Sequence, residues 1–393
     1  MKNDPIVIAA ARRTPIGAFQ GTLAPVSATS LGAAAIRAVL ADARLEGANV
    51  SEVFMGCVLP AGLGQAPARQ ASLEAGIPNT VGCTTVNKVC GSGMKAVMLG
   101  HDLILAGAAK IVVAGGMESM TNAPYLLPKA RSGYRMGHQQ VLDHMFFDGL
   151  QNPYDGNMMG KFAEDTADKY DFSREAQDEF ATESVRRARE ANESGTFGDE
   201  IVPVTVKTRK GESVVDRDEE PYNCNIEKIP TLRPAFRKDG TVTAASSSSI
   251  SDGAAAVVLM RESEASRRNI EPFARISGHD GHAHEPEWFT TAPVFAVQAL
   301  HEDLGWSPDD VDLYEINEAF AVVAMVAMRE LGIDHAQFNV NGGACALGHP
   351  IGATGARLVV TLLHALRSRQ RKRGVAALCI GGGEATALAV ESL

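Results

Sequence analysis

Short apolar runs alternate with amphipathic stretches along most of the chain. The apolar runs have the length of buried β-strands, and the stretches between them carry apolar residues at helical spacing. Strands are expected at 5–11, 51–59 and 110–119, an extended segment at 84–90, and helices at 27–45, 67–76 and 91–108. Strands that alternate with helices build sheets with helices on their faces, so the pattern predicts an α/β fold with a mostly parallel sheet.

The middle of the chain, from about residue 120 to residue 245, has a different character. Methionine, proline and charged residues become more frequent there, and the alternation weakens. Residues 173–195 predict one amphipathic helix that follows a serine cap and ends at a glycine, and residues 200–215 predict a hairpin. Because the alternation resumes afterwards and continues to the end, we interpret this block as an insertion.

The end of the chain repeats features of its beginning. The segments "VAGGMES" and "CIGGGEA" match, with Glu118 and Glu384 placed 384 − 118 = 266 residues apart. Cys90 and His349 are separated by a similar 349 − 90 = 259 residues. Near-equal separations favour a duplicated domain. The predicted parts are one half at 1–120 plus 245–270, the insertion at 121–244, and the second half at 271–393.

Composition narrows the class of protein. The 393 residues are 45% apolar and 21% charged, which is enough apolar material for a sizeable core. The formal charge of −10 argues against bulk binding of nucleic acid or an anionic membrane. Six cysteines without a CxxC pair or zinc-type histidine spacing predict neither a disulfide framework nor a metal site. With no apolar run of about 18 residues, we expect a soluble, cytoplasmic protein.

Cys90 is the first candidate for chemistry. It ends an extended segment and directly precedes a helix that begins "GSGMKAV". A side chain on such an elbow points outward, and the helix N-terminus favours a thiolate over a thiol. An ordinary cysteine has a pKa of about 8.5, so we expect the pKa of this nucleophile to be lowered. The alternative is a cysteine that only packs in the core.

His349 and Cys379 lie in two further glycine-rich segments. His349 precedes a proline in "GGACALGHPIGATGAR", which holds it out of helical conformation, and it could deprotonate a thiol. Cys379 ends an apolar strand before three glycines, where Gly381 offers a backbone N–H to an oxyanion. Asn317 follows another strand, and its neutral amide could hold a water or a thioester oxygen. Structural roles are the alternative for each residue, and helix capping is the alternative for Asn317.

Four motifs together carry a resemblance to a known family. "NKVCGSGMKAV", "NEAFA", "GGACALGHPIGATGAR" and "CIGGGEA" resemble the thiolase family in order and in separation, and "AARRTPIGAFQG" and "RPAFRKDGTVTA" extend the resemblance over essentially the whole chain. Within that family the motifs most resemble those of the bacterial acetyl-CoA acetyltransferases. The resemblance implies a five-layered α-β-α-β-α fold of two duplicated halves, with an inserted loop domain that serves coenzyme A (CoA) binding and tetramerisation.

The resemblance also implies roles for the candidate residues. Cys90 would accept the acyl group as a thioester, His349 would activate Cys90, and Cys379 would move the proton at the α-carbon of acetyl-CoA. Asn317 would hold a water that forms one oxyanion hole with His349. The backbone N–H groups of Cys90 and Gly381 would form the other.

CoA would be a substrate and product, and no permanently bound cofactor or metal is implied. By the same resemblance Ser248 would bond the pantetheine arm, and the residues near it would be Leu232, Phe236, Ala244, Met159 and Phe320. The sequence departs from the family pattern in places. Ser246 replaces an asparagine, and Phe289 stands about where methionine is common, which bears on acyl chain length. Arg233 and Arg237 are the arginines considered for the CoA phosphates, with a surface role as the alternative.

The activity implied is acetyl-CoA C-acetyltransferase, the reversible condensation of two acetyl-CoA molecules to acetoacetyl-CoA and CoA. The first alternative is a 3-ketoacyl-CoA thiolase of broader or longer chain length in fatty-acid β-oxidation. A decarboxylating ketosynthase is disfavoured by Cys379, and a non-catalytic acyl-CoA binder is disfavoured because both cysteines and His349 are present. The segment 130–150 resembles the family's tetramerisation loop, so a homotetramer is expected, with Met145, Phe146 and Phe147 as candidate contacts.

Overall fold

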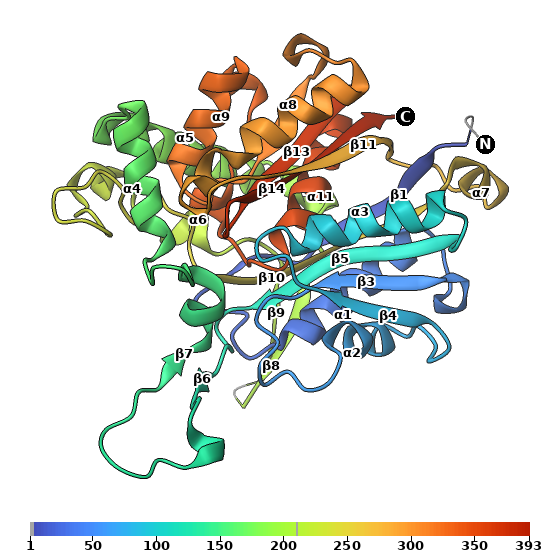
Figure 1. Ribbon diagram of the computed structural model, residues 1–393. Helices are drawn as coiled ribbons and strands as arrows, with labels where there is room; N and C mark the ends of the chain where they lie inside the picture. Colours follow the sequence, from blue (N-terminus) through green and yellow to red (C-terminus); the bar gives the residue numbers. More distant parts are fainter. Residues whose placement is uncertain (1–3, 210) are drawn as a thin grey trace.

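One large mixed sheet forms the centre of the molecule. The computed structural model describes residues 4–209 and 211–393. Within them, ten strands form a sheet in the order β12-β13-β14-β11-β1-β10-β5-β3-β4, with the short β2 paired to β10 (Figure 1). The first half contains β1 (Ile6–Arg13), β2 (Gly17–Ala18), β3 (Glu52–Gly56), β4 (Gly82–Val86), β5 (Ile111–Ser119) and β10 (Ser251–Arg261). The second contains β11 (Ala274–Ala283), β12 (Leu313–Ile316), β13 (Arg373–Ile380) and β14 (Glu384–Ser392).

The two halves of the sheet have the same strand order. The run β3-β5-β10-β1 corresponds to β12-β13-β14-β11, with the first pair parallel and the next two antiparallel in both. Outside β3 lies the parallel strand β4, and outside β12 a parallel bridge joins Tyr314 to Phe338 at the equivalent place. This shared topology agrees with the duplication indicated by the sequence. The expectation of a mostly parallel sheet is wrong, because a tight glycine turn sends β14 back along β13.

Helices cover both outer faces and fill the space between the halves. On the first half lie α1 (Ala28–Asp42) and α2 (Pro67–Glu74), and on the second lie α8 (Ala292–Leu304) and α9 (Ala321–Leu331). Between them, α3 (Ser92–Leu105) packs against α11 (Thr354–Ser368), and α11 contacts both half-sheets. All residues of α11 from Thr354 to Leu366 are buried, as a helix surrounded by other elements requires. Five layers, α-β-α-β-α, result (Figure 1).

The half-sheets are joined along a short seam. Only Val7 with Arg275 and Ile8 with Ala274 pair β1 with β11. The apolar faces of α3 and α11 provide a further contact between the halves. Their buried side chains form one cluster with strands of both halves, which includes Met94, Leu358 and Leu378.

The insertion lies between β5 and β10. It contains a long helix, α5 (Arg174–Glu193), which begins after the Ser173 cap and is followed by Gly195 in the left-handed region, so the predicted helix is confirmed. The predicted hairpin is β8 (Val204–Thr208) with β9 (Gly211–Val215). A separate arm carrying β6 (Tyr125–Leu126) and β7 (Leu142–Asp143) extends away from the body (Figure 1).

Shorter elements complete the chain. The remaining α-helices are α4 (Met159–Tyr170), α6 (Glu220–Asn223), α7 (Glu262–Arg267) and α10 (Ala344–Leu347). Single helical turns of other types lie at Gly47–Asn49, Ala130–Ser132, Phe146–Leu150, Thr196–Asp199, Ile226–Thr231, Pro286–Thr291, Pro308–Asp310 and His335–Gln337. Among residues 4–209 and 211–393, no helix combines the length and apolar character needed to span a bilayer.

Candidate active site

A cavity of about 220 Å³ lies where the two halves and the insertion meet. The first half contributes Cys90, and the second contributes His349, Cys379 and Gly381. Its remaining wall is mainly apolar and consists of Met120, Phe146, Gly149, Leu150, Met158, Met159, Gly160, Phe236, Ser247, Ser248, Ser249, Ile250, Phe289, Ala319, Phe320 and Ile351. Two thiols and one imidazole from distant parts of the sequence thus share one mostly apolar space.

Cys90 sits on a strained turn between β4 and α3. The preceding residue, Val89, has a φ of 47°, a left-handed conformation that is costly for a β-branched side chain. Ser92 stabilises the turn, because its hydroxyl accepts from the Lys88 N–H at 2.9 Å and donates to the Val89 carbonyl at 2.7 Å. A Cβ on Gly91 would lie 2.4 Å from Ile380 Cδ1, so glycine lets the turn approach β13 closely.

The protonation of Cys90 differs from the sequence-based expectation. Burial raises its pKa to about 11, while hydrogen bonds from the backbone N–H groups of Gly381 and Cys90 itself oppose that rise. The helix N-terminus therefore does not produce a resting thiolate, because loss of hydration outweighs it. The shift favours the thiol form of Cys90 at neutral pH. The two N–H groups that reach its sulfur stand where an oxyanion next to that sulfur would form.

His349 lies on the wall of the same cavity. Its Nδ1 lies 2.6 Å from the hydroxyl oxygen of Thr354, and that hydroxyl donates its one proton to the Pro350 carbonyl at 2.9 Å. Nδ1 therefore carries the proton that Thr354 accepts, and Nε2 keeps a lone pair. Nε2 is buried and has no hydrogen-bond partner among the described residues. Burial, with a smaller effect of the Arg357 charge, lowers the pKa of His349 to about 3, so the ring is neutral.

Cys379 is the second thiol on the cavity wall. It lies near the end of β13, next to the turn that Gly382 and Gly383 make with φ values of 97° and 87°. Burial, and then the proximity of Cys90, raise its pKa well above the ordinary value. Cys379 is therefore a neutral thiol at rest, in the form that can donate a proton.

Asn317 and Glu318 follow β12 and are not among the residues that line the cavity. The Asn317 amide is fully buried, and neither its nitrogen nor its oxygen has a partner among the described residues. A buried amide with both atoms free is a place where an ordered water is expected. Glu318 orients neither Asn317 nor a histidine. Its carboxylate accepts from Ser184, Asn339 and the Cys345 N–H, which holds the loop before His349 in place.

Some of the residues expected to bind CoA line the cavity, and others do not. Ser248, Phe236, Met159 and Phe320 line the cavity, and the rings of Phe236 and Phe320 meet edge to face at 5.8 Å. Leu232 and Ala244 are not among the lining residues. Arg237 is engaged elsewhere, because its guanidinium makes two hydrogen bonds to Asp168 at 2.7 and 3.0 Å.

Two residues that sequence reasoning did not select support the site. Thr354 fixes the His349 ring from five residues further along the chain. Glu118, at the end of β5, accepts hydrogen bonds from the N–H groups of Val58, Leu59 and Gly352. Burial raises the Glu118 pKa to about 7. The sequence could have indicated the role of Glu118, because it ends a buried strand in "VAGGMES" and a buried carboxylate needs hydrogen-bond donors nearby.

Comparisons with known proteins identify the family of this chain. A family model described as the thiolase N-terminal domain matches residues 6–263, and one described as the thiolase C-terminal domain matches residues 270–392. The chain belongs to the thiolase family. The fold class and family predicted from the sequence motifs are therefore confirmed.

Among its thiolase relatives, an acetyl-CoA acetyltransferase of Escherichia coli K12 is 51% identical over 395 residues, covering 100% of both chains. One from Pseudomonas aeruginosa is 49% identical over 385 residues, covering 98% of each chain. A solved thiolase, Acat5 from Ascaris suum in complex with coenzyme A, superposes with a TM-score of 0.94 at 42% identity, covering 99% of this chain and 100% of that one.

Proposed function

We propose that this thiolase is an acetyl-CoA C-acetyltransferase, which condenses two acetyl-CoA molecules to acetoacetyl-CoA and CoA and runs the same reaction in reverse. The observation that carries the proposal is the single cavity that contains Cys90, His349 and Cys379 together with the Gly381 N–H directed at the Cys90 sulfur. The names of the E. coli and P. aeruginosa relatives support the choice of acetyl-CoA.

The resting protonation states suit the thiolysis direction. The Cys90 sulfur attacks the 3-keto carbon of acetoacetyl-CoA, and the free lone pair of His349 Nε2 takes its proton. The bond between carbons 2 and 3 then breaks, which leaves an acetyl group on Cys90 and an enolate of acetyl-CoA. The neutral Cys379 thiol protonates that enolate, and acetyl-CoA departs.

The second half of the cycle restores the enzyme. The Cys379 thiolate takes the proton of an incoming CoA thiol, and the CoA sulfur attacks the acetyl carbonyl on Cys90. The Cys90 sulfur leaves and recovers its proton from the His349 imidazolium, so every proton is accounted for. Covalent acylation splits the reaction into two steps and predicts ping-pong kinetics.

Negative charge collects on an oxygen in each step, and neutral donors stabilise it. The Cys90 and Gly381 N–H groups serve the oxyanion beside the Cys90 sulfur. A water on the unpartnered Asn317 amide, together with His349, serves the enolate oxygen. Loss of one such donor costs about 10²–10³ in rate. Ser248, with Met159, Phe236 and Phe320, holds the pantetheine arm that delivers the thioester.

Intact-mass and peptide mass spectrometry after mixing with acetyl-CoA tests the proposal. One acetyl group is expected on the peptide that contains Cys90. Cys90→Ser should abolish the adduct, whereas Cys224→Ser, which changes a cysteine outside the cavity, should retain it. Acetylation elsewhere, or turnover by Cys90→Ser at the normal rate, would refute the mechanism.

The acyl chain length of the preferred substrate distinguishes the proposed activity from that of a β-oxidation thiolase. Phe289 is buried and stands in the cavity wall, where a bulky ring limits the space beside the thiols. We therefore expect CoA-dependent cleavage of acetoacetyl-CoA to exceed that of a long-chain 3-ketoacyl-CoA in kcat/KM. A large preference for the long chain would favour the alternative.

The arm that carries β6 and β7 supports the proposal of a homotetramer. It extends away from the body and carries exposed apolar side chains, with Met136 91% and Tyr125 67% exposed. Such a patch on an extended arm is suited to contact another copy of the chain. Met145, one of the contacts suggested by the sequence, instead packs inside its own chain at 4% exposure. Light scattering should give the mass of four chains, and a single-chain mass would refute the proposal.

The cytoplasm is the compartment that the cysteines favour. All six are free, and two of them are needed as thiols, which a reducing compartment preserves. Cell fractionation should recover the activity with cytoplasmic markers, and recovery with an extracytoplasmic fraction would contradict this assignment.

A further inference from the structure

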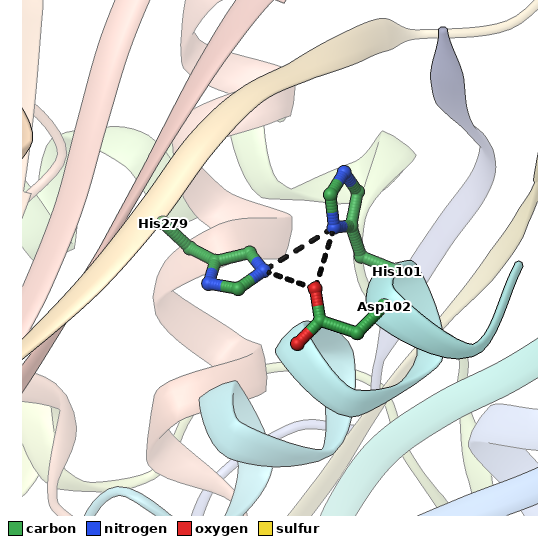
Figure 2. Close-up of side chains that lie close together, drawn as sticks. All are labelled: His101, Asp102 and His279. Atoms are coloured by element: carbon green, nitrogen blue, oxygen red, sulfur yellow. Dashed lines mark hydrogen bonds and ion pairs between the residues drawn. The ribbon is translucent and has the colours of Figure 1, made fainter. Parts of the chain in front are cut away.

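Outside the catalytic cavity, three metal-ligating side chains from both halves of the molecule converge. His101 and Asp102 are neighbours on α3, and His279 lies on β11 (Figure 2). His279 Nε2 is 2.9 Å from Asp102 Oδ1 and 3.2 Å from His101 Nδ1, and His101 Nδ1 is 3.1 Å from Asp102 Oδ1. Three potential ligand atoms thus form a small triangle, with every side at hydrogen-bond length.

Hydrogen bonds do not satisfy all three contacts of this triangle at once. If both imidazole nitrogens carry a proton, each can donate to the carboxylate, but the two N–H groups then oppose each other at 3.2 Å. If only one nitrogen carries a proton, the lone pair of the other faces the carboxylate oxygen. Every arrangement of protons leaves one unfavourable contact, whereas a cation at the centre is attractive to all three atoms.

The triangle has the size that a small transition-metal ion needs. Zinc binds imidazole nitrogen and carboxylate oxygen at about 2.0–2.2 Å, and tetrahedral angles then place the ligand atoms roughly 3.3–3.5 Å apart. The three separations fall only a few tenths of an ångström below that spacing, so a slight outward movement of the side chains would fit the ion. Asp102 is about half exposed, which leaves an open side for entry and for a water ligand.

The donor types point to a transition metal. Two imidazoles and one carboxylate favour a zinc-like ion over Mg²⁺ or Ca²⁺, which prefer oxygen donors.

We propose that His101, Asp102 and His279 bind one divalent transition-metal ion of the Zn²⁺ type, which connects the two halves of the molecule. His279 lies four residues beyond Arg275, the end of the short β1–β11 seam, and the ion would extend that connection to α3. The site is separate from the proposed chemistry. His101 is nine residues along α3 from Ser92, a rise of roughly 14 Å.

Zn²⁺ titration by calorimetry tests the site, with metal-stripped full-length protein and four variants. His101→Ala and His279→Ala each remove a ligand, and Asp102→Asn removes the charge while keeping the shape. His282→Ala is the matched control, because this histidine is on the same strand but stacks on Phe295 with ring centroids 4.8 Å apart. Circular dichroism verifies that each variant is folded.

The wild type and His282→Ala should bind one more Zn²⁺ equivalent than the ligand variants, or bind it at least about tenfold more tightly. Zn²⁺ should also raise the melting temperature of the wild type and the control but not of His279→Ala. Any Zn²⁺ bound by the catalytic thiols is common to all proteins and cancels in the comparison. Equal stoichiometry and affinity in the wild type and His279→Ala would overturn the proposal.

Discussion

Thr354→Val tests how the catalytic base is oriented. The threonine hydroxyl is the partner of His349 Nδ1 at 2.6 Å and donates to the Pro350 carbonyl at 2.9 Å. Valine has the same shape, so packing is retained while both hydrogen bonds are lost. The imidazole then loses the contact that keeps its proton on Nδ1 and leaves Nε2 free to accept the proton of Cys90.

The expected size of the effect follows from burial. The substitution leaves the buried Nδ1–H of His349 without its partner, whereas the Pro350 carbonyl still accepts from the Ala353 and Thr354 N–H groups. One unsatisfied buried group costs about 1–3 kcal/mol. If about 1.4 kcal/mol of that cost falls on the preference for the correct tautomer and orientation, the acylation rate drops about tenfold. Substrate contacts do not change, so KM should remain within about a factor of two while kcat falls.

Rapid-quench measurement of Cys90 acetylation, together with steady-state thiolysis, separates these quantities. Thr166→Val is the matched control, because Thr166 is equally buried and loses hydrogen bonds to Thr290 and to the Phe162 carbonyl away from His349. The control should lose stability but retain its acylation rate. An unchanged acylation rate in Thr354→Val, or an equal loss in the control, would refute the reasoning.

Three further predictions test other parts of the structure. His349 should make the fold acid-sensitive, because its pKa is about 3 in the folded protein and about 6.5 in the unfolded chain. The free energy of unfolding should therefore decrease as the pH falls below about 6.5. In urea titrations His349→Gln should lose less stability than the wild type between about pH 7 and pH 5. Phe289→Ala should raise relative kcat/KM for longer 3-ketoacyl-CoA substrates about tenfold in competition assays, and an unchanged ratio would place the acyl chain elsewhere. Arg13→Met should lower the free energy of unfolding by about 3–5 kcal/mol in denaturant titrations, because it leaves the buried carboxylates of Glu200 and Asp218 without their ion pairs. A decrease of less than about 1 kcal/mol would contradict this account.

The candidate site residues and the family could be predicted from the sequence because each depends on a short, contiguous motif. Cys90, His349, Cys379 and Gly381 each lie where an element ends at a glycine-rich turn, and the structure places all four on one cavity wall. Their chemical roles stay predictions. The family followed from motifs long enough to be specific.

What the sequence could not provide depends on contacts between distant segments. The pKa of Cys90 was expected to fall because a helix start is visible in sequence, but burial in the folded chain raises it. The His101–His279 contact joins residues 178 apart, so no local metal-binding spacing exists to detect. His282 and His284 are closer to His279 in the chain, yet those two pack on Phe295 instead.

The repeated strand order has a consequence for how the activity is divided. In the proposed mechanism the first copy provides the nucleophile, and the second provides the base, the other thiol and the Gly381 amide, so neither copy is self-sufficient. A polypeptide cleaved between β10 and β11 would yield two inert fragments, and turnover would return only on their reassembly. The proposed activity therefore belongs to the assembled pair of copies rather than to either copy alone.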